Sequence, residues 1–179
     1  MIDYTKEELV ELIYKHPEKF NQWKAEQDEV DLSEIDFSTM TFNEVDFSGV
    51  DLNSSSFSDC NISLVNFNNA DLTSVDFTRA KVVECDFSES LLNGADCSYA
   101  EMTYCNFSDA DMAGCIFSES NLSNSDFTSS YNLHACRFDD ETVWPEPELM
   151  PDDFDAVYKD DLSAMKDEED DFNSSDGAY

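Results

Sequence analysis

Most side chains able to do chemistry in this sequence are carboxylates that recur every five residues. The protein has 179 residues, 42 of them acidic and 9 basic, so its formal net charge is −33. Acid and base catalysis needs two carboxylates in different environments, whereas these carboxylates stand in equivalent positions. A ladder of equivalent charges instead creates a negative surface that attracts a basic partner.

Ten aspartates, each one position before an apolar residue, are predicted to form an acidic partner-binding surface: Asp31, Asp36, Asp46, Asp51, Asp71, Asp76, Asp86, Asp96, Asp111 and Asp126. We expect no catalytic site and no cofactor, because the sequence shows no polar groups converging on a pocket and no glycine-rich phosphate loop. His16 and His134 are interpreted as surface residues.

The charge also restricts the class of partner. Contacts to phosphate need Lys and Arg, so direct binding to nucleic acid or to an anionic membrane is not expected. The sequence has no apolar run of about 18 residues and opens with MIDYTKEEL, which predicts neither a membrane span nor a signal peptide. The expected location is cytoplasmic.

The six cysteines could in principle form disulfides or bind a metal, but their spacing indicates neither. Five stand two positions before an apolar residue of the five-residue pattern, and Cys97 occupies an apolar position itself. There is no C-x-x-C and no Cys/His cluster. We therefore predict buried free thiols and no metal site; the five are Cys60, Cys85, Cys105, Cys115 and Cys136.

The element that must position these side chains is the apolar pattern itself, which runs in steps of five from Leu32 to Phe127. A period of five matches neither the 3.6 residues of a helix nor the 2.0 of a strand, so it predicts a repeat architecture. Units such as Ala-Asp-Leu-Thr-Ser from Ala70 and Cys-Asp-Phe-Ser-Glu from Cys85 resemble those of pentapeptide-repeat proteins. The segment Phe20-Asn21-Gln22-Trp23-Lys24 is similar to a leader found in that family.

The resemblance implies an all-β fold, a right-handed quadrilateral parallel β-helix in which four five-residue sides make one twenty-residue coil. Positions twenty apart should then stack, and the residues there are chemically uniform. One such column is all phenylalanine, and a second holds four leucines and a methionine. The columns are Phe47, Phe67, Phe87, Phe107 and Phe127, and Leu32, Leu52, Leu72, Leu92 and Met112.

We predict three parts, with residues 1–29 as a helical N-terminal cap and residues 30–143 as the β-helix. In the first part, Thr5 and Glu8 form a capping box and Pro17 suits the first turn of a second helix. This helix pair is interpreted as a cover for the first coil, with partner binding as the alternative. After Phe127 the pattern slips by one residue, which we place at Ser129-Ser130 as a bulge.

Residues 144–179 form the third part, an acidic C-terminal segment. The repeats are predicted to stop at Trp144, because Pro145 and Pro147 cannot donate to another ladder. A short amphipathic helix is expected around Phe154, Tyr158 and Leu162, either sealing the last coil or pairing with its copy in a homodimer. From Lys166 onward the composition is that of a solvated tail.

One side of the predicted coil breaks the acidic pattern. Its outward positions hold Thr41, Asn61, Lys81, Glu101 and Asn121 in place of an aspartate ladder. We interpret the nearby apolar residues, with those of the C-terminal helix, as an interaction or dimer patch; scattered surface residues are the alternative reading. The set is Leu64, Val83, Tyr99, Tyr104, Phe154, Tyr158 and Leu162.

The family resemblance implies a non-catalytic DNA mimic, because gyrase-inhibiting members present a rod-shaped acidic surface to the DNA-binding saddle of the enzyme. The expected partner is a basic DNA-binding protein, either DNA gyrase or a nuclease. The alternative is a rigid scaffold or adaptor whose acidity serves only solubility.

Overall fold

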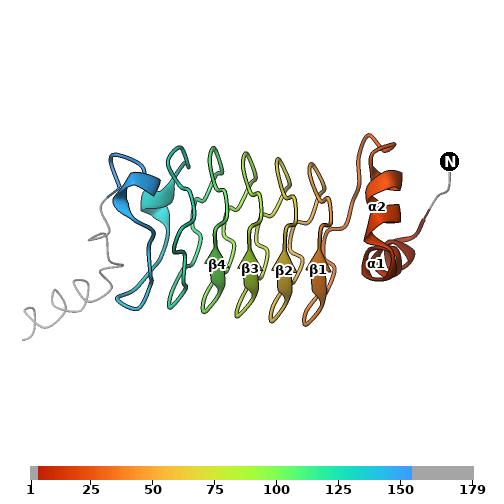
Figure 1. Ribbon diagram of the computed structural model, residues 1–179, viewed down its shortest axis with the longest axis horizontal. Coiled ribbons are helices and arrows are strands. Elements are labelled where there is room, and N and C mark those ends of the chain that lie inside the picture. The colour runs from red at the N-terminus through yellow and green to blue at the C-terminus, as the bar shows by residue number, and fades with distance from the viewer. Residues whose placement is uncertain (1–3, 155–179) are drawn as a thin grey trace, which may run out of the picture.

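The computed structural model describes residues 4–154 as a row of coils with two helices at its N-terminal end (Figure 1). Within these residues, no helix has the length and apolar character needed to cross a membrane. The elements are α1 (Lys6–Lys15), α2 (Pro17–Lys24), β1 (Thr41–Asn43), β2 (Asn61–Ser63), β3 (Lys81–Val83), β4 (Glu101–Thr103) and two 3-10 turns, Leu133–Ala135 and Pro147–Leu149.

As far as Tyr131, each coil contains twenty residues and pairs in parallel with the next. The four strands form one sheet in the order β1-β2-β3-β4, and Phe42, Ile62 and Val82 are direct partners within it. In these coils the other sides pair through single parallel bridges at the same offset, such as Asp31 with Asp51. Figure 1 shows the strands side by side along the row. The repeat architecture predicted from the five-residue period is therefore present, and its parallel pairing agrees with what the family resemblance implies.

The core is a set of columns along the coil axis. The predicted phenylalanine column from Phe47 to Phe127 is fully buried, and its successive ring centroids lie 5.5, 4.8, 4.9 and 4.7 Å apart at interplanar angles of 13–20°. Such offset stacking adds to the stabilisation from apolar burial. The leucine column is at most 1% exposed. Both predicted columns are confirmed.

The corners between the sides have an unusual backbone conformation. Every fifth residue from Glu34 to Asn124 has a positive φ, between 54° and 75°, and only three of these residues are glycines. Left-handed backbone is uncommon for other residues and costs energy. Hydrogen bonds between coils hold it in place, as when the Glu34 N–H donates to the Asn53 carbonyl at 2.8 Å. The side chains at these corners therefore project outward.

The two helices cover the first coil, and the capping box predicted at Thr5 and Glu8 is present. Phe20 of α2 is fully buried with its ring 5.8 Å from that of Phe47. The Asn21 amide donates to the Glu44 carbonyl and accepts from the Asp46 N–H, both at 2.9 Å. Asn21 thereby supplies the acceptor that the Asp46 N–H would otherwise find in a preceding coil, as the Asn66 N–H finds the Val45 carbonyl, and this blocks growth at this edge.

Lys6 of α1 also binds the first coil and lowers the pKa of Asp31 there. Lys6 Nζ lies 2.7 Å from Asp31 Oδ1, and its hydrogen bond, with others from Ser33, lowers the Asp31 pKa to about 2. In a Lys6→Met variant, we expect NMR titration of the Asp31 carboxyl to give a midpoint raised from about 2 toward 3.8. Because folding lowers this pKa, the pair stabilises above pH 3.8, and its contribution is lost as the pH falls through about 2.

The matched control is Lys15→Met, since Lys15 pairs with Glu11 on the same helix. This control is expected to leave the Asp31 titration unchanged. An unchanged Asp31 midpoint in the Lys6 variant would contradict the assignment.

The prediction that the extra residue lies at Ser129-Ser130 is wrong. Tyr131 still pairs with Asp111 at the twenty-residue offset, whereas Arg137 pairs with Ile116, one residue late. The insertion therefore lies between Tyr131 and Arg137, where Asn132 has a φ of 59° and begins a 3-10 turn. The physical reason is that Leu133, and not Asn132, is the apolar residue that must be buried, so the chain needs one extra residue to turn it inward.

The last parallel bridge in residues 4–154 joins Asn121 to Val143, which agrees with the predicted end of the repeats at Trp144. The Leu122 N–H donates to the Val143 carbonyl and the Phe127 N–H to the Leu149 carbonyl, both at 2.8 Å. In these two bonds the final segment acts only as acceptor, so the missing N–H groups of the intervening prolines do not prevent the pairing.

Phe154 packs into the closure of this end, in agreement with the expectation that its segment seals the last coil. Its ring centroid lies 4.9 Å from that of Trp144 and 6.2 Å from that of Phe138, and Trp144 in turn packs against Phe117 and Phe127. Tyr158, Leu162 and the helix predicted around them lie outside the described residues.

Candidate protein-interaction surfaces

The ten predicted aspartates stand in columns on three sides of the coil. Asp31, Asp51 and Asp71 are consecutive bridge partners on the side of the leucine column, called here the Leu face. Beyond them Leu91, which is 44% exposed, separates Asp71 from Asp111. The sequence argument overlooked Leu91, although the five-residue period could have located it.

The other two acidic sides are interrupted in a similar way. On the side of Phe37, Asp36 and Asp76 are separated by Ser56, and Asp96 is followed by Ile116. On the side of Phe47, aspartates alternate with asparagines in the order Asp46, Asn66, Asp86, Asn106, Asp126. The ladders are therefore regular in position but not continuous in charge.

Each of the ten aspartates has the same structural role. Its Oδ1 accepts a hydrogen bond from the backbone N–H two residues later, at 2.8–3.3 Å. This Asx turn is a common way for Asp and Asn to hold local backbone. Asn66, Asn106 and Asn121 make the same bond at 2.9–3.1 Å. The fold therefore requires an acceptor at these positions and does not require a charge.

Hydrogen bonding also favours the ionised state of several carboxylates. Bonds from the Ser38 hydroxyl and N–H lower the pKa of Asp36. Burial raises the pKa of Asp46, but bonds from Ser48 and the Lys24 ion pair outweigh it, so the net shift is downward. These groups are negative at neutral pH.

The basic side chains are largely engaged by neighbouring carboxylates. We define the strand face as the outer side of β1–β4 together with its two bordering corners. On this face, Arg79 makes a bidentate pair with Asp59 through Nε and Nη2 at 2.8 and 2.7 Å. Lys81 lies 3.3 Å from Glu101. These two pairs make the middle of the strand face close to neutral.

The strand face also gathers exposed apolar side chains. Leu64, Tyr99 and Tyr104 are 49%, 56% and 60% exposed, and Val83 is partly buried beside the buried Thr103. Four of the predicted patch residues are thus brought to one side. Tyr131, 57% exposed near the end of the Leu face, is a further exposed aromatic that sequence reasoning missed.

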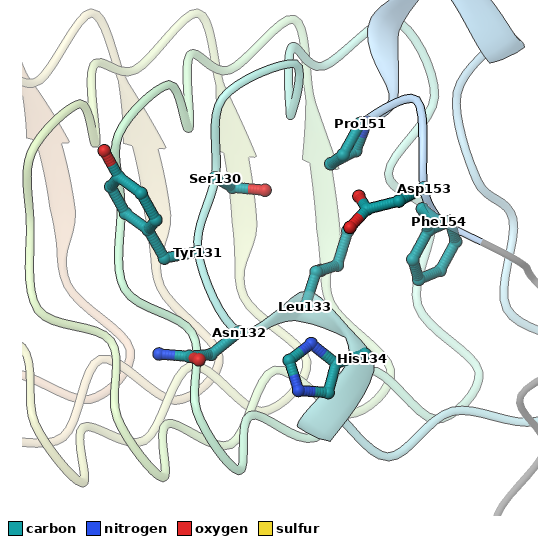
Figure 2. Close-up of a pocket in the computed structure, with 8 residues that line it drawn as sticks. All are labelled: Ser130, Tyr131, Asn132, Leu133, His134, Pro151, Asp153 and Phe154. Carbon is teal, nitrogen blue, oxygen red and sulfur yellow. The ribbon is translucent and has the colours of Figure 1, made fainter.

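A cavity of about 200 Å³ lies near the C-terminal end (Figure 2). Figure 2 shows Leu133 and His134 of the 3-10 turn on one side of it and Pro151, Asp153 and Phe154 on the other. Its volume is below the ~300–1,000 Å³ typical of ligand pockets. His134 and His16 are exposed, as predicted. Residues 4–154 contain no group of three His, Cys, Asp or Glu side chains placed to hold a metal ion.

All six cysteines are free and buried, as predicted. Burial raises the pKa of the Cys60 thiol to about 11 and raises that of Cys97 as well. Because all six thiols are at most 8% exposed, we expect a thiol reagent such as DTNB to modify none of them at pH 8 in the native protein and all six in urea. Rapid modification of the native protein would contradict this burial.

Two family models match the chain and together cover more than half of it. One, described as "Pentapeptide repeat region", matches residues 25–97, and the other, "Pentapeptide repeats (8 copies)", matches residues 105–140. Neither describes a catalytic family. A comparison with curated protein sequences found no match.

The chain is also similar to solved structures. A pentapeptide repeat protein from the Arabidopsis thaliana thylakoid lumen is 34% identical over 56% of this chain and 66% of its own length, with a TM-score of 0.33. A pentapeptide repeat protein from Nostoc PCC 7120 is 23% identical over 57% and 78%, with a TM-score of 0.45. QnrB1, a plasmid-mediated fluoroquinolone resistance protein, is 17% identical over 80% and 90%, with a TM-score of 0.23.

Proposed function

The chain belongs to the pentapeptide-repeat family, and from this premise we propose that it is a non-catalytic DNA mimic. In this proposal the acidic faces bind a basic DNA-binding protein, such as DNA gyrase or a nuclease, and inhibit or modulate it. The proposal includes the right-handed, four-sided coil and the three-part division of the chain. It also includes a cytoplasmic location, where such a partner would act.

The observation that carries the proposal is the charge density along the coil axis. Eighteen acidic and two basic residues lie between Asp31 and Asp126. These residues span about five coils, each rising ~4.8 Å, so there is roughly one net negative charge per ~1.5 Å. Duplex DNA carries one per about 1.7 Å of its axis. The two rods therefore present similar linear charge to a basic groove.

The local contacts support this comparison. Because the Asx turns tie each aspartate to the backbone, their carboxylates are held at regular positions and lose little side-chain entropy on binding. The negative potential should steer encounter with a basic surface and make binding weaken as salt rises.

The proposal is tested by competition. The full chain is titrated into gyrase bound to a fluorescent DNA duplex at low salt, and gyrase supercoiling is measured in parallel; a basic nuclease serves as a second target. We expect displacement of the duplex at micromolar concentration, with a strong dependence on salt. Poly-glutamate at equal total charge is the control, and it should compete less well because its charges are not fixed on a rod.

Failure to displace DNA from any of these proteins, or displacement no better than that by poly-glutamate, would overturn the mimic proposal. The scaffold alternative would then be favoured, and the neutral centre of the strand face is the observation that supports it.

A further inference from the structure

We propose that the strand face has a second binding site, separate from the acidic faces, for a basic amphipathic helix of a partner protein. The helix would lie along the coil axis beside the corner column Glu44, Leu64, Glu84 and Tyr104. This site goes beyond the mimic function and does not depend on it.

The first supporting observation is where the large apolar residues stand. Leu64, Tyr99 and Tyr104 all occupy left-handed corner positions, with φ of 54°, 62° and 57°. Bulky residues are disfavoured there, whereas Gly and Asn are well suited. All three are nevertheless about half exposed or more, so they gain little burial in return. Of the nineteen corner positions, these alone hold large apolar side chains, and all three border the strand face.

The second observation is the pairing of charge across the same face. Arg79 and Lys81 are both engaged, by Asp59 and Glu101. A partner can therefore cover the middle of this face without burying an unpaired cation. The strand face exposes tyrosine, arginine and leucine around a neutral centre. Of these, tyrosine and arginine are residue types enriched in interface hot spots.

The third observation identifies the occupant. Along one corner column, exposed Glu44 and Glu84 alternate with Leu64 and Tyr104. Adjacent coils are ~4.8 Å apart, so Leu64 and Tyr104 are separated by about 10 Å with Glu84 midway. Residues i and i+7 of an α-helix are about 10.5 Å apart along its axis, with i+3 at about 4.5 Å. A helix with apolar residues at i and i+7 and Lys or Arg at i+3 matches this column in spacing and in charge.

A second copy of this chain fits the column poorly. Each copy carries a net charge of −33, and the strand face is bordered by Glu44, Glu84 and Glu119. Two such faces would repel each other, whereas a basic helix is attracted.

The test uses the full chain, labelled for NMR, and two synthetic peptides of about 15 residues, a length at which helices become stable. One peptide has Leu at i and i+7 and Lys at i−4 and i+3; the other is a scramble of the same composition. We expect the first to shift the amides of residues 64, 84 and 104 saturably. The scramble should produce only weak shifts spread over the acidic faces.

The decisive variant is Leu64→Asn with Tyr104→Asn. Because Asn suits left-handed backbone, its melting temperature should be unchanged or raised by a few degrees. Affinity for the patterned peptide should fall about tenfold or more, as for loss of an interface hot spot. The matched control is Ser54→Asn with Ser74→Asn, which changes corner residues at φ of 58° and 57° on another edge without changing charge. It should bind like wild type.

Equal binding of both peptides, or wild-type affinity in the Leu64 and Tyr104 variant, would overturn the site. So would a wild-type dimer in sedimentation that this variant abolishes, since a second copy would then be the occupant. The DNA competition assay reports on the acidic faces, so either proposal can fail while the other holds.

Discussion

Replacing Asp51, Asp71 and Asp111 together by asparagine is expected to weaken binding to a basic DNA-binding protein by roughly 10- to 100-fold at low salt. Each exposed charge pair contributes about 0.5–1 kcal/mol to such binding. The fold should be retained, because Asn66 and Asn106 already accept the same backbone hydrogen bond at 2.9–3.0 Å. Duplex displacement measured over a range of salt concentrations gives the affinity, and the salt dependence should become shallower.

A second triple variant, with alanine at the same three positions, separates charge from structure. Alanine removes the acceptor of each Asx turn, so stability should fall by about 0.5–1.5 kcal/mol per lost bond. The asparagine variant should show no such loss and gain slightly from reduced repulsion. If it displaces DNA as well as wild type, the aspartates of the Leu face do not contact the partner.

Replacing Phe87 by alanine is expected to lower the free energy of unfolding by about 3–5 kcal/mol, the usual cost of removing a buried aromatic ring. Phe87 is fully buried, with the rings of Phe67 and Phe107 stacked on either side at 4.8 and 4.9 Å and Phe77 at its edge at 5.8 Å. Urea unfolding followed by circular dichroism measures the change. The loss is large because the cavity lies between coils, and in a solenoid each coil is held only by its neighbours.

Phe87→Leu is the control, because leucine fills the equivalent place in the neighbouring Leu column. It should cost less than about 1.5 kcal/mol, as for other hydrophobic exchanges of similar volume. A loss below about 1 kcal/mol in the alanine variant would show that the coils collapse around the gap and that the stack is not a main source of stability.

The core could be predicted from the sequence because a single rule generates it. A residue such as Phe67 is apolar, stands in the five-residue period, and has Phe47 and Phe87 twenty positions away, so its burial and its stacking partners follow from counting. The N-terminal cap was equally readable, since the capping box of Thr5 and Glu8 is a local signal. Counting fails at Asn132, because there the burial of Leu133 decides the path of the chain.

The sequence by itself therefore determined the columns, the inward cysteines and the excess of negative charge, since these depend only on residue type and period. Only the tertiary structure decided the state of each surface group. Arg79 finds Asp59 and Lys81 finds Glu101 one coil away, and hydrogen bonds between coils hold Leu64 and Tyr104 in left-handed corners. The physical reason is that these contacts join residues about a full coil apart, and their strength depends on geometry that residue type alone does not specify.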